Sequence, residues 1–303
     1  MTLTVIILTY KPDERFDRIL RMLALQRQQP ERVLVVNTGE EWFRPQALQH
    51  YPGAEVVHIR PEEFDHGGTR AMAAELCDTD VMLFMTQDAV PKDEYLIEEL
   101  MADFAEEDVA CVYARQLPAP GADPLERYSR SFNYGQIRRK KTADDLPRLG
   151  IKTFFCSDVC AAYRRSIYER LCGFEKHVIF NEDMILAGRA VRSGYAVVYE
   201  PEAQVIHSHS YSGLQQLRRN FDLGVSQAQY PGIFESVSSE KEGLKMVTSQ
   251  IRYLSKNGKM IYLPKLFWQT GCKLIGYKLG KAYRKLPDRM IEKLTMNPGY
   301  WKQ

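Results

Sequence analysis

Short apolar segments alternate with helical periodicity through the first 115 residues. The segments with the length and β-branched content of buried strands are Leu3–Leu8, Val33–Asn37, Val56–Ile59, Val81–Met85 and Ala110–Ala114. Between them, apolar residues recur at helical spacing, first at Phe16, Ile19, Leu20 and Leu23, and again at Tyr95, Leu96, Leu100 and Phe104. Buried strands that alternate with amphipathic helices predict an α/β fold, with helices flanking a mostly parallel sheet.

The polar residues directly after these strands are the first candidates for function. Ligands of such sheets bind in the crevice beyond the carboxyl ends of the strands. The residues at these ends are Thr9, Tyr10 and Lys11, then Asn37 to Glu40, and then Thr86, Gln87 and Asp88. We therefore expect these segments to face one common site.

Regular periodicity breaks down between residues 117 and 150. Several prolines and glycines interrupt secondary structure, and consecutive basic residues follow at 138–141. We expect a long loop or a small excursion, which is usually functional or mobile. Further on, the pattern predicts helices near Arg164–Leu171 and Glu182–Arg192, strands near Ala196–Tyr199 and Gln204–Ser208, and helical structure after Gly213.

Charge sets the C-terminal segment apart. Residues 245–303 contain 13 Lys and Arg against 2 Asp and Glu, whereas residues 1–244 contain 28 against 37. Bulky apolar and aromatic residues such as Phe267 and Trp268 lie between the basic ones. Such a segment can lie in an anionic membrane interface, or it can pack as a basic helix on the rest of the protein. Nucleic acid also attracts basic segments, but no motif that reads bases occurs, so we expect no nucleic-acid partner.

The sequence predicts a cytoplasmic protein without a membrane span. No run approaches the about 18 apolar residues that a spanning helix needs. The first residues, MTLTVIILTYKPDE, have no basic n-region and no cleavage site, so we expect a first strand rather than a signal peptide. The six cysteines lack the spacing of a disulfide framework and are expected to be reduced thiols.

Asp88 is a candidate metal ligand. It ends the strand in VMLFMTQDA, where a carboxylate points into the ligand crevice and can hold a divalent cation against a diphosphate. The alternative is a helix cap, a position for which Asp93 is better placed.

Two adjacent acids, Glu182 and Asp183, open the helix that follows Phe180. The helix dipole favours negative side chains at this end, so capping explains the pair without any function. In a functional interpretation, one of the two carboxylates takes a proton from an acceptor hydroxyl during nucleophilic attack.

His207 and His209 alternate at a strand end, so both imidazoles point to the same face. Imidazole is a good ligand for transition metals, although a single histidine is more often structural or exposed. A zinc site with Cys156 and Cys160 is conceivable, but the CxxxC spacing is loose.

Two further motifs are weak evidence for a ligand-binding role by themselves. In His66–Arg70, the glycines allow backbone to approach a ligand and Arg70 can meet a phosphate, but a plain glycine-rich loop is the simpler interpretation. Arg218 and Arg219 lie on a predicted helix and can equally form a solvated face.

In this order, the motifs resemble family 2 glycosyltransferases with the GT-A fold, and among them the bacterial rhamnosyltransferase-like members. The resemblance covers roughly residues 2–230, and its most specific stretch is AAYRRSIYERLCGFEKHVIFNEDMILAGRAVRSGYAVVYEPEAQVIHSHS. It contains the YRRS segment, a GGF-like turn (here CGF), the ED pair, a PEA-like turn and the histidine of the family pattern.

The resemblance implies a donor site at the strand ends. ILTYKPD matches the element that contacts the nucleotide, and VVNTGE matches the element whose first Asp meets a pyrimidine base, a position occupied here by Asn37. GGTRA matches a further donor element, and Gln216 to Asn220 resembles the QxxRW element of processive members without its Trp. The implied donor-site residues are Thr9, Tyr10, Asn37, Gly68, Arg70, Gln87, Asp88, Arg218 and Arg219.

The catalytic residues follow from the same resemblance. TQDA matches the metal-binding DxD with Thr86 in place of the first Asp, which leaves Asp88 as the carboxylate ligand. His207 matches the second ligand, so Mn²⁺ or Mg²⁺ is implied between these side chains and the diphosphate. Asp183 falls on the general base with Glu182 beside it, and His209 is a candidate on the acceptor side.

The implied enzyme is an inverting, non-processive transferase of one sugar, with L-rhamnose from dTDP-β-L-rhamnose as the favoured donor. The expected acceptor is a polyprenyl-linked or growing cell-surface glycan, reached from the inner face of the cell membrane. Two alternatives are the same chemistry with a UDP-hexose and, because the DxD is incomplete, an inactive subunit that binds nucleotide sugar or glycan.

The expected organisation has two parts. Residues 1–235 form the catalytic domain, with a nucleotide-binding half of about residues 1–115 and an acceptor-binding half of about residues 116–235. Residues 236–303 form the basic helical tail, which either contacts an anionic membrane or packs on the catalytic domain.

Overall fold

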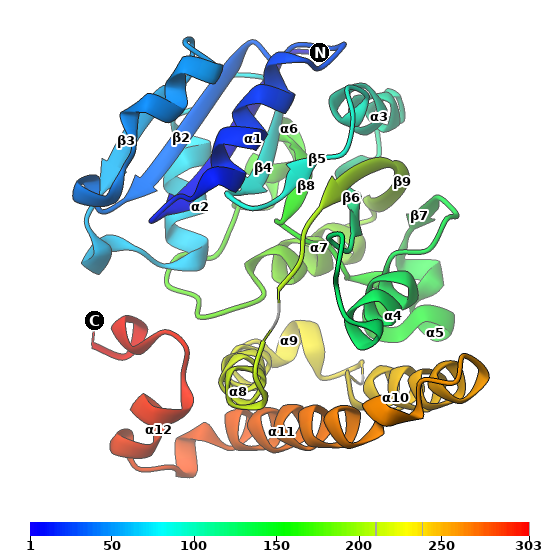
Figure 1. The fold of residues 1–303 in the computed structure, drawn as a ribbon. Coiled ribbons are helices and arrows are strands. Elements are labelled where there is room, and N and C mark those ends of the chain that lie inside the picture. Colours follow the sequence, from blue (N-terminus) through cyan, green and yellow to red (C-terminus); the bar gives the residue numbers. More distant parts are fainter. Residues whose placement is uncertain (210, 238, 303) are drawn as a thin grey trace.

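The computed structural model describes residues 1–209, 211–237 and 239–302. A twisted sheet lies between two layers of helices, and the C-terminal helices lie below it in the view of Figure 1. The strand order is β3-β2-β1-β4-β8-β6-β9-β5, with β7 paired to β9. The strands are β1 (Leu3–Tyr10), β2 (Arg32–Thr38), β3 (Glu55–Ile59), β4 (Val81–Thr86), β5 (Val90–Pro91), β6 (Val109–Leu117), β7 (Arg139–Lys141), β8 (Cys160–Arg164) and β9 (Ala196–Ile206).

The first half of the sheet, β1 to β4, is parallel, as the sequence predicts. Alternate residues of each strand face two separate cores: Val5 and Ile7 pack under α1 (Glu14–Ala24) and α3 (Leu96–Ala102), while Ile6 packs under α2 (His66–Glu75) and α7 (Glu182–Arg192). Both faces are therefore apolar, which explains why these strands are continuous hydrophobic runs rather than alternating ones.

The second half of the sheet is mixed, because β8 runs antiparallel to both neighbours, β4 and β6. The sequence pattern did not separate this strand from the helix after it, α6 (Arg165–Arg170). Its residues, CAAYR, are mostly small and give little periodic signal, although all but the last are buried. A strand of five residues flanked by two partners takes its stability from them rather than from local propensity.

Of the two expectations for the segment 117–150, the long loop is wrong, because the segment has secondary structure of its own. It contains α4 (Pro124–Asn133), β7 and α5 (Leu146–Leu149). Asp123 caps α4 by accepting hydrogen bonds from the amides of Leu125 and Glu126, and Pro124 occupies the first helical position. The proline that looked like a structure breaker thus begins a helix, since its missing N–H would have no partner there anyway.

The two strands predicted around residue 200 are one strand, β9. A register shift opposite Ala114 and Arg115 interrupts its pairing with β6 near Pro201, and the strand continues on the other side. The turn-like PEA sequence therefore makes an irregularity within a strand, which bends the strand locally.

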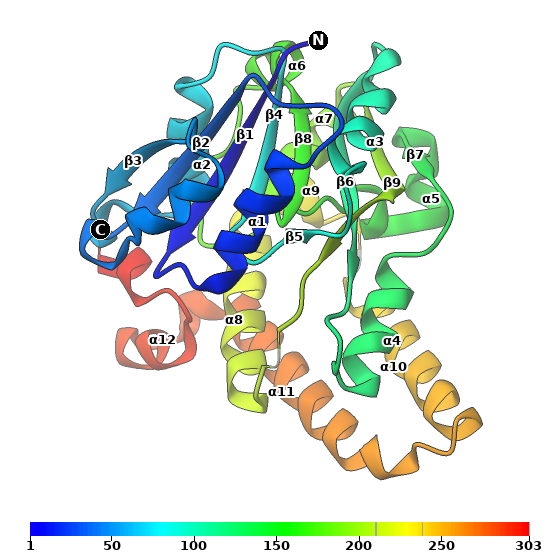
Figure 2. The same cartoon turned by 45° about the horizontal axis from the view of Figure 1, so that its top comes forward.

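The C-terminal helices pack on the sheet domain rather than extending away from it (Figure 2). They are α8 (Gly213–Gln229), α9 (Pro231–Phe234), α10 (Ser239–Lys256), α11 (Leu263–Lys281) and α12 (Asp288–Leu294). Helices α8 and α11 touch backbone to backbone, because a Cβ at Gly276 or Gly280 would collide with the carbonyl of Leu217 or Phe221. Within the described ranges, no helix is long and apolar enough to cross a membrane.

This backbone contact makes a stability prediction. Gly276→Ala forces α8 and α11 apart and is expected to lower the free energy of unfolding by about 1–3 kcal/mol. The matched control is Gly271→Ala in the same helix, where an added Cβ meets nothing within 4 Å. It is expected to raise stability by up to about 1 kcal/mol, because alanine favours helix. Urea unfolding of both variants measures the difference, and equal effects would contradict the tight α8–α11 contact.

Candidate active site

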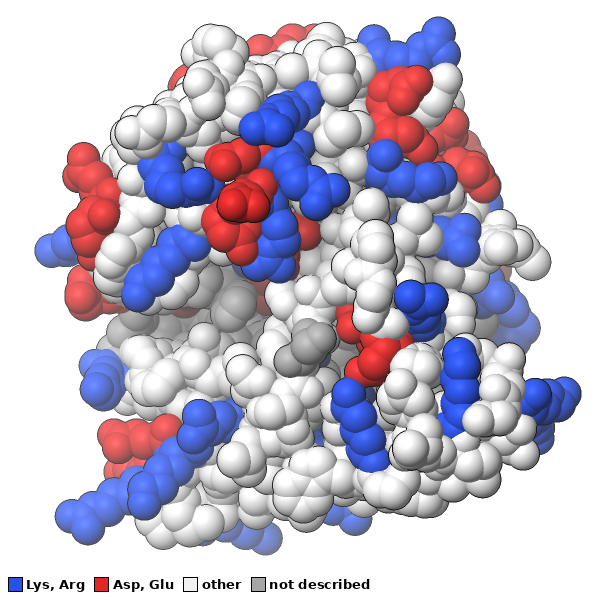
Figure 3. All heavy atoms as spheres, viewed as in Figure 1, with Lys and Arg blue, Asp and Glu red and all other residues white. Residues whose placement is uncertain are grey.

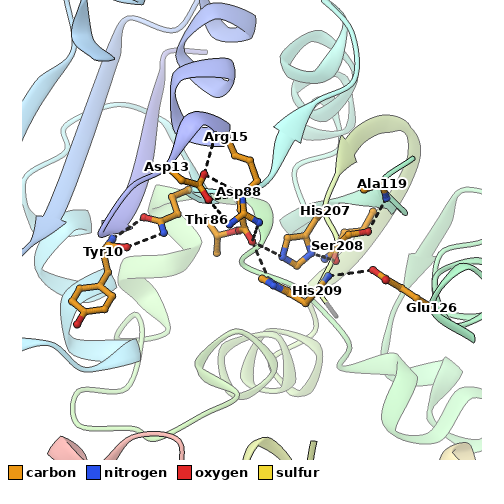
Figure 4. Close-up of polar contacts among 12 residues, drawn as sticks. Tyr10, Asp13, Arg15, Thr86, Asp88, Ala119, Glu126, His207, Ser208 and His209 are labelled. Carbon is orange, nitrogen blue, oxygen red and sulfur yellow. Dashed lines mark hydrogen bonds and ion pairs between the residues drawn. The ribbon is translucent and has the colours of Figure 1, made fainter. Parts of the chain in front are cut away.

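Three potential metal ligands meet where β4 ends beside the end of β9 (Figure 4). The short strand β5 follows Asp88, and its Val90 pairs antiparallel with Ile206 of β9. This pairing holds Asp88 next to the two histidines: its Oδ2 lies 3.5 Å from Nε2 of His207 and 3.1 Å from Nε2 of His209. The three ligand atoms lie within 4.8 Å of one another.

Neighbouring groups orient the His207 imidazole and hold the backbone of His209. Nδ1 of His207 lies 3.0 Å from Oε1 of Gln116, and Arg130, which is 3.2 Å from the same ring nitrogen, donates to that oxygen as well. When Nδ1 donates its hydrogen to Gln116, Nε2 keeps a lone pair on the side of Asp88. The backbone amide of His209 donates to Glu126 of α4 at 3.2 Å. The sequence analysis missed Gln116 and Arg130, which no motif marks.

The cluster has the protonation state that a divalent cation needs. Burial lowers the pKa of His207, and it lowers the pKa of His209 to about 4, so both imidazoles are neutral at pH 7. Burial by itself raises the pKa of Asp88, but the hydrogen bond and charge of His207 and the nearby His209 outweigh it and hold this pKa well below its usual range. One carboxylate and two neutral imidazoles therefore face one point.

The cluster carries one further polar contact and one cation. Thr86, in place of the first acid of a DxD, donates its hydroxyl to Asp88 Oδ1 at 2.9 Å. Arg15, at the start of α1, lies 3.5 Å from Asp88 Oδ2 and is held by Asp13 at 2.7 Å. Because the Arg15 side chain is 43% exposed, it can turn toward an anionic ligand beside Asp88.

Behind the start of α7, a buried ion network holds the acidic pair. Arg70 lies 3.0 Å from Asp158 and 3.0 Å from Glu182, and all three side chains are buried. The hydroxyl of Tyr163 donates to Asp158 at 2.5 Å. Buried charges are stable only when they are paired in this way. The structure thus gives Arg70 an internal role between two buried acids, and its contact with the donor phosphates stays a prediction.

Asp183 has no cationic partner at hydrogen-bond distance within the described residues. Its carboxylate accepts hydrogen bonds from the backbone amides of Met184 at 2.6 Å and Asp158 at 3.2 Å. Burial, and then the charges of Glu182 and Asp158, raise its pKa well above the usual range of an aspartate. A carboxylate of raised basicity is suited to accept a proton at neutral pH.

At the end of β1 and β2, Thr9 and Asn37 bond to each other instead of facing solvent. The Thr9 hydroxyl donates to the Asn37 side-chain oxygen at 2.9 Å, and the Asn37 amide nitrogen lies 3.0 Å from the carbonyl of Gly39 and 3.1 Å from Nδ1 of His58. Asn37 is fully buried. It therefore holds the loop after β2 in place, which makes it a support for the predicted donor site.

An exposed aromatic shelf lies beside this loop. Gln87 clamps the backbone of Tyr10 by two hydrogen bonds of 2.7 and 2.9 Å. The Tyr10 ring packs edge-to-face on Trp42 at 5.1 Å, and the ammonium of Lys11 lies 4.0 Å from the Trp42 centroid. Such a surface can stack a nucleotide base. The sequence analysis missed Trp42, although an aromatic residue just after the Gly39 turn is a usable signal.

The glycine pair at the start of α2 serves packing. Asp65 caps the helix by accepting from the amides of Gly67 at 3.1 Å and Gly68 at 2.7 Å. A side chain at Gly67 would collide with the carbonyl of Glu175, and one at Gly68 with the Asp65 carboxylate. The helix begins at His66, and Asp65 occupies its first amides, so they are not open to a ligand.

The two arginines of α8 have different partners. Arg218 donates to the carbonyl of Lys293 at 3.1 Å, so it ties α8 to the C-terminal segment instead of facing the predicted donor site. The guanidinium of Arg219 lies 4.7 Å from the Phe180 ring and is close enough to act electrostatically on both Glu182 and His207. Arg219 is therefore the positive charge that α8 contributes near the site.

The alternative zinc site does not form. Sγ of Cys156 lies 3.8 Å from Sγ of Cys111, and the metal-ligand grouping in the described part of the chain includes no cysteine. Burial raises the pKa of the Cys156 and Cys160 thiols far above the usual range, whereas zinc binds thiolates.

Comparison of the sequence with known proteins gives consistent matches. The model of glycosyl transferase family 2 matches residues 4–172. The O-antigen chain rhamnosyltransferase RfbN of Salmonella typhimurium is 37% identical over 99% of this chain and 96% of its own length. The N-acetylglucosaminyl-diphospho-decaprenol L-rhamnosyltransferase of Mycobacterium tuberculosis is 24% identical over 69% of this chain and 77% of its own.

Solved structures share the fold at low sequence identity. A mannosyltransferase from Pyrobaculum calidifontis, solved with GDP-Man and Mn²⁺, superimposes with a TM-score of 0.63 at 16% identity, covering 94% of this chain and 88% of that one. TarS of S. aureus in complex with UDP gives a TM-score of 0.54 at 15% identity, over 94% and 92% of the two chains. This likeness confirms the predicted GT-A fold.

The cluster makes a metal-binding prediction. If both imidazoles bind a cation with Asp88, His207→Ala and His209→Ala each weaken Mn²⁺ binding roughly tenfold or more, since even residues that only orient metal ligands contribute that much. Isothermal titration of the full-length protein with MnCl₂ measures this. His50→Ala, on the surface away from the cluster, serves as the control and should bind normally. An unchanged affinity in His209→Ala would mean that Asp88 and His207 bind the ion without it.

Proposed function

The chain belongs to glycosyl transferase family 2 and is a glycosyltransferase, and from this premise we propose that it transfers single L-rhamnosyl units from dTDP-β-L-rhamnose, with inversion, to a lipid-linked or growing cell-surface glycan such as O-antigen. The near full-length similarity to an O-antigen chain rhamnosyltransferase supports the sugar and the acceptor. The geometry that carries the mechanism is the Asp88, His207 and His209 cluster on the sheet edge where family donors bind.

The donor lies with its base against the shelf of Tyr10 and Trp42 and its diphosphate beside Asp88. The cluster would hold a divalent cation, which neutralises the diphosphate as negative charge builds on this leaving group. Two imidazole donors favour Mn²⁺ over Mg²⁺, because Mg²⁺ prefers oxygen ligands. Arg15, which lies 3.5 Å from Asp88, and Arg219, which acts electrostatically on His207, add positive charge near the same group.

Asp183 takes the proton of the attacking acceptor hydroxyl. The Arg70 network fixes the backbone around it, because Asp158, which Arg70 and Tyr163 hold, donates its amide to the Asp183 carboxylate. The sugar is attacked from the side opposite the diphosphate, so the anomeric carbon inverts. A β-linked donor then gives an α-linked product.

The outer face of the C-terminal helices is suited to a membrane surface. Phe267, Leu274, Ile275 and Lys278 are exposed and recur at helical spacing along one side of α11, opposite the side that contacts α8. Exposed Ile261 precedes this stripe. In Figure 3, Lys and Arg side chains lie among uncharged residues along the lower edge of the molecule, with one acidic group at the lower left. Apolar groups among lysines bind an anionic leaflet. We therefore place the enzyme on the cytoplasmic face of the cell membrane, where a polyprenyl-linked acceptor is presented.

The first test concerns the base. Asp183→Asn is expected to reduce transfer from dTDP-β-L-rhamnose by about 10²-fold or more, since a general base contributes about 10²–10⁴-fold, while dTDP binding stays unchanged. The transfer rate is measured as dTDP release in the presence of a lipid-linked acceptor, and dTDP affinity is measured by titration. Asp144→Asn, at an exposed acid, is the control. Full activity of Asp183→Asn would exclude it as base, and turnover only with a UDP-hexose would replace the proposed donor.

The second test concerns the membrane. Ile275→Glu, at an exposed position, is expected to reduce co-sedimentation with vesicles containing anionic phospholipid several-fold without changing the melting temperature. Leu25→Glu, at an equally exposed apolar residue at the end of α1, should bind as the wild type does. Equal binding of wild type and Ile275→Glu would contradict docking through α11.

A further inference from the structure

A cavity lies in the half of the protein that follows residue 110, and none of its lining residues belongs to the candidate active site. It has a volume of about 220 Å³ and lies between the sheet, at β6, β7 and β9, and the segment from α4 to residue 155. Its inner wall consists of the buried residues Tyr113, Lys141 and Tyr199, while Ser131, Asn133 and Arg139 lie exposed at its edge. None of the residues assigned to the metal, the base or the donor lines it.

Lys141 is a buried cation without a counter-ion. Its side chain is only 3% exposed, and its ammonium contacts the Tyr113 hydroxyl at 3.2 Å, the carbonyl of Lys152 at 3.2 Å and the carbonyl of Phe155. All three partners are neutral. Among the residues that the structure describes, no carboxylate forms an ion pair with it. Proteins normally pair a buried charge, because an unpaired one is costly.

The rest of the lining adds positive charge and no negative charge. Arg139 has no ion pair within residues 1–209, 211–237 and 239–302, and Lys152 stacks 4.1 Å from the Phe132 centroid. The lining includes no acid. Outside it, Glu242 pairs with Lys152 at 3.1 Å, and Asp145 acts on Lys141 only at longer range. The cavity therefore presents three cations, of which one is paired to an acid.

The remaining lining suits a sugar ring rather than a bare ion. The rings of Tyr113, Tyr199 and Phe155 form a continuous aromatic wall, with centroid distances of 5.2 Å between the two tyrosines and 5.6 Å between Tyr113 and Phe155. Ser131 and Asn133 supply hydroxyl and amide groups at the rim. Small-molecule sites combine apolar walls with a few polar groups in this way, and a volume below about 300 Å³ limits the ligand to one small unit.

We propose that this cavity binds a monosaccharide-sized anion, a sugar ring that carries one carboxylate or one phosphate group. The acidic group accepts hydrogen bonds from the Arg139 guanidinium. Its charge also balances that of Lys141, whose three N–H groups are used by Tyr113, Lys152 and Phe155. The ring lies along the tyrosine wall. Binding in this cavity is separate from donor binding at Asp88, so the two can be tested independently of each other.

Calorimetric titration of the full-length protein with four probes tests this. Glucuronate carries the carboxylate, glucose 6-phosphate the phosphate, glucose the ring alone and inorganic phosphate the charge alone. At least one of the two sugar anions is expected to bind at least tenfold more tightly than glucose and than inorganic phosphate. Whichever of the two binds more tightly identifies the acidic group.

Variants locate the binding. Arg139→Gln changes an exposed side chain, so it leaves the fold intact and is expected to weaken binding of the sugar anion at least tenfold. Arg60→Gln, at an exposed arginine of the nucleotide-binding half, is expected to leave this affinity unchanged. Asp88→Ala is expected to abolish metal-dependent dTDP binding but to bind the sugar anion as tightly as the wild type does. The proposal is overturned if neither sugar anion binds, if glucose or inorganic phosphate binds as tightly, if Arg139→Gln has no effect, or if Asp88→Ala removes the binding.

Discussion

The pairing of two residues of β5 with the end of β9 is the contact on which the site depends. Asp88 stands at the end of β4 and His207 at the end of β9, and two strands, β8 and β6, separate β4 from β9 in the sheet. The chain after Asp88 crosses that gap as β5, where Val90 pairs with Ile206. Without this crossing, the carboxylate and the imidazoles would lie at separate places along the sheet edge.

In the proposed mechanism, two aspartates with opposite environments divide the chemistry. Asp88 faces imidazoles and stays ionised, with its pKa far below the usual range, as suits a metal ligand. Burial and the nearby charges of Glu182 and Asp158 raise the pKa of Asp183, as suits a proton acceptor. Carboxylates pushed apart in this way commonly hold different catalytic roles. Arg70 pairs with both neighbouring acids, which offsets the cost of burying them beside Asp183.

The apolar pattern predicted the parallel half of the sheet, because strands buried on both faces are continuous hydrophobic runs. The family and the GT-A fold came from the resemblance of the ordered motifs, not from this pattern. The pattern missed β8, whose small residues are strand only because β4 and β6 flank them, and it took the capped helix α4 for loop. Within the site, the sequence marked Asp88, His207 and Asp183 through motifs. It could not place His209 on Asp88 or pair Arg70 with Glu182, since both contacts join distant segments.

The most direct test is pulsed electron paramagnetic resonance of Mn²⁺ bound to the full-length protein in the presence of dTDP. If Asp88, His207 and His209 hold the ion against the diphosphate, the spectrum contains ¹⁴N couplings from two imidazoles together with ³¹P coupling from the nucleotide, and the ¹⁴N signal falls in His209→Ala. A ³¹P coupling without any ¹⁴N coupling would show that the ion binds the nucleotide away from this cluster, and would contradict the proposed site.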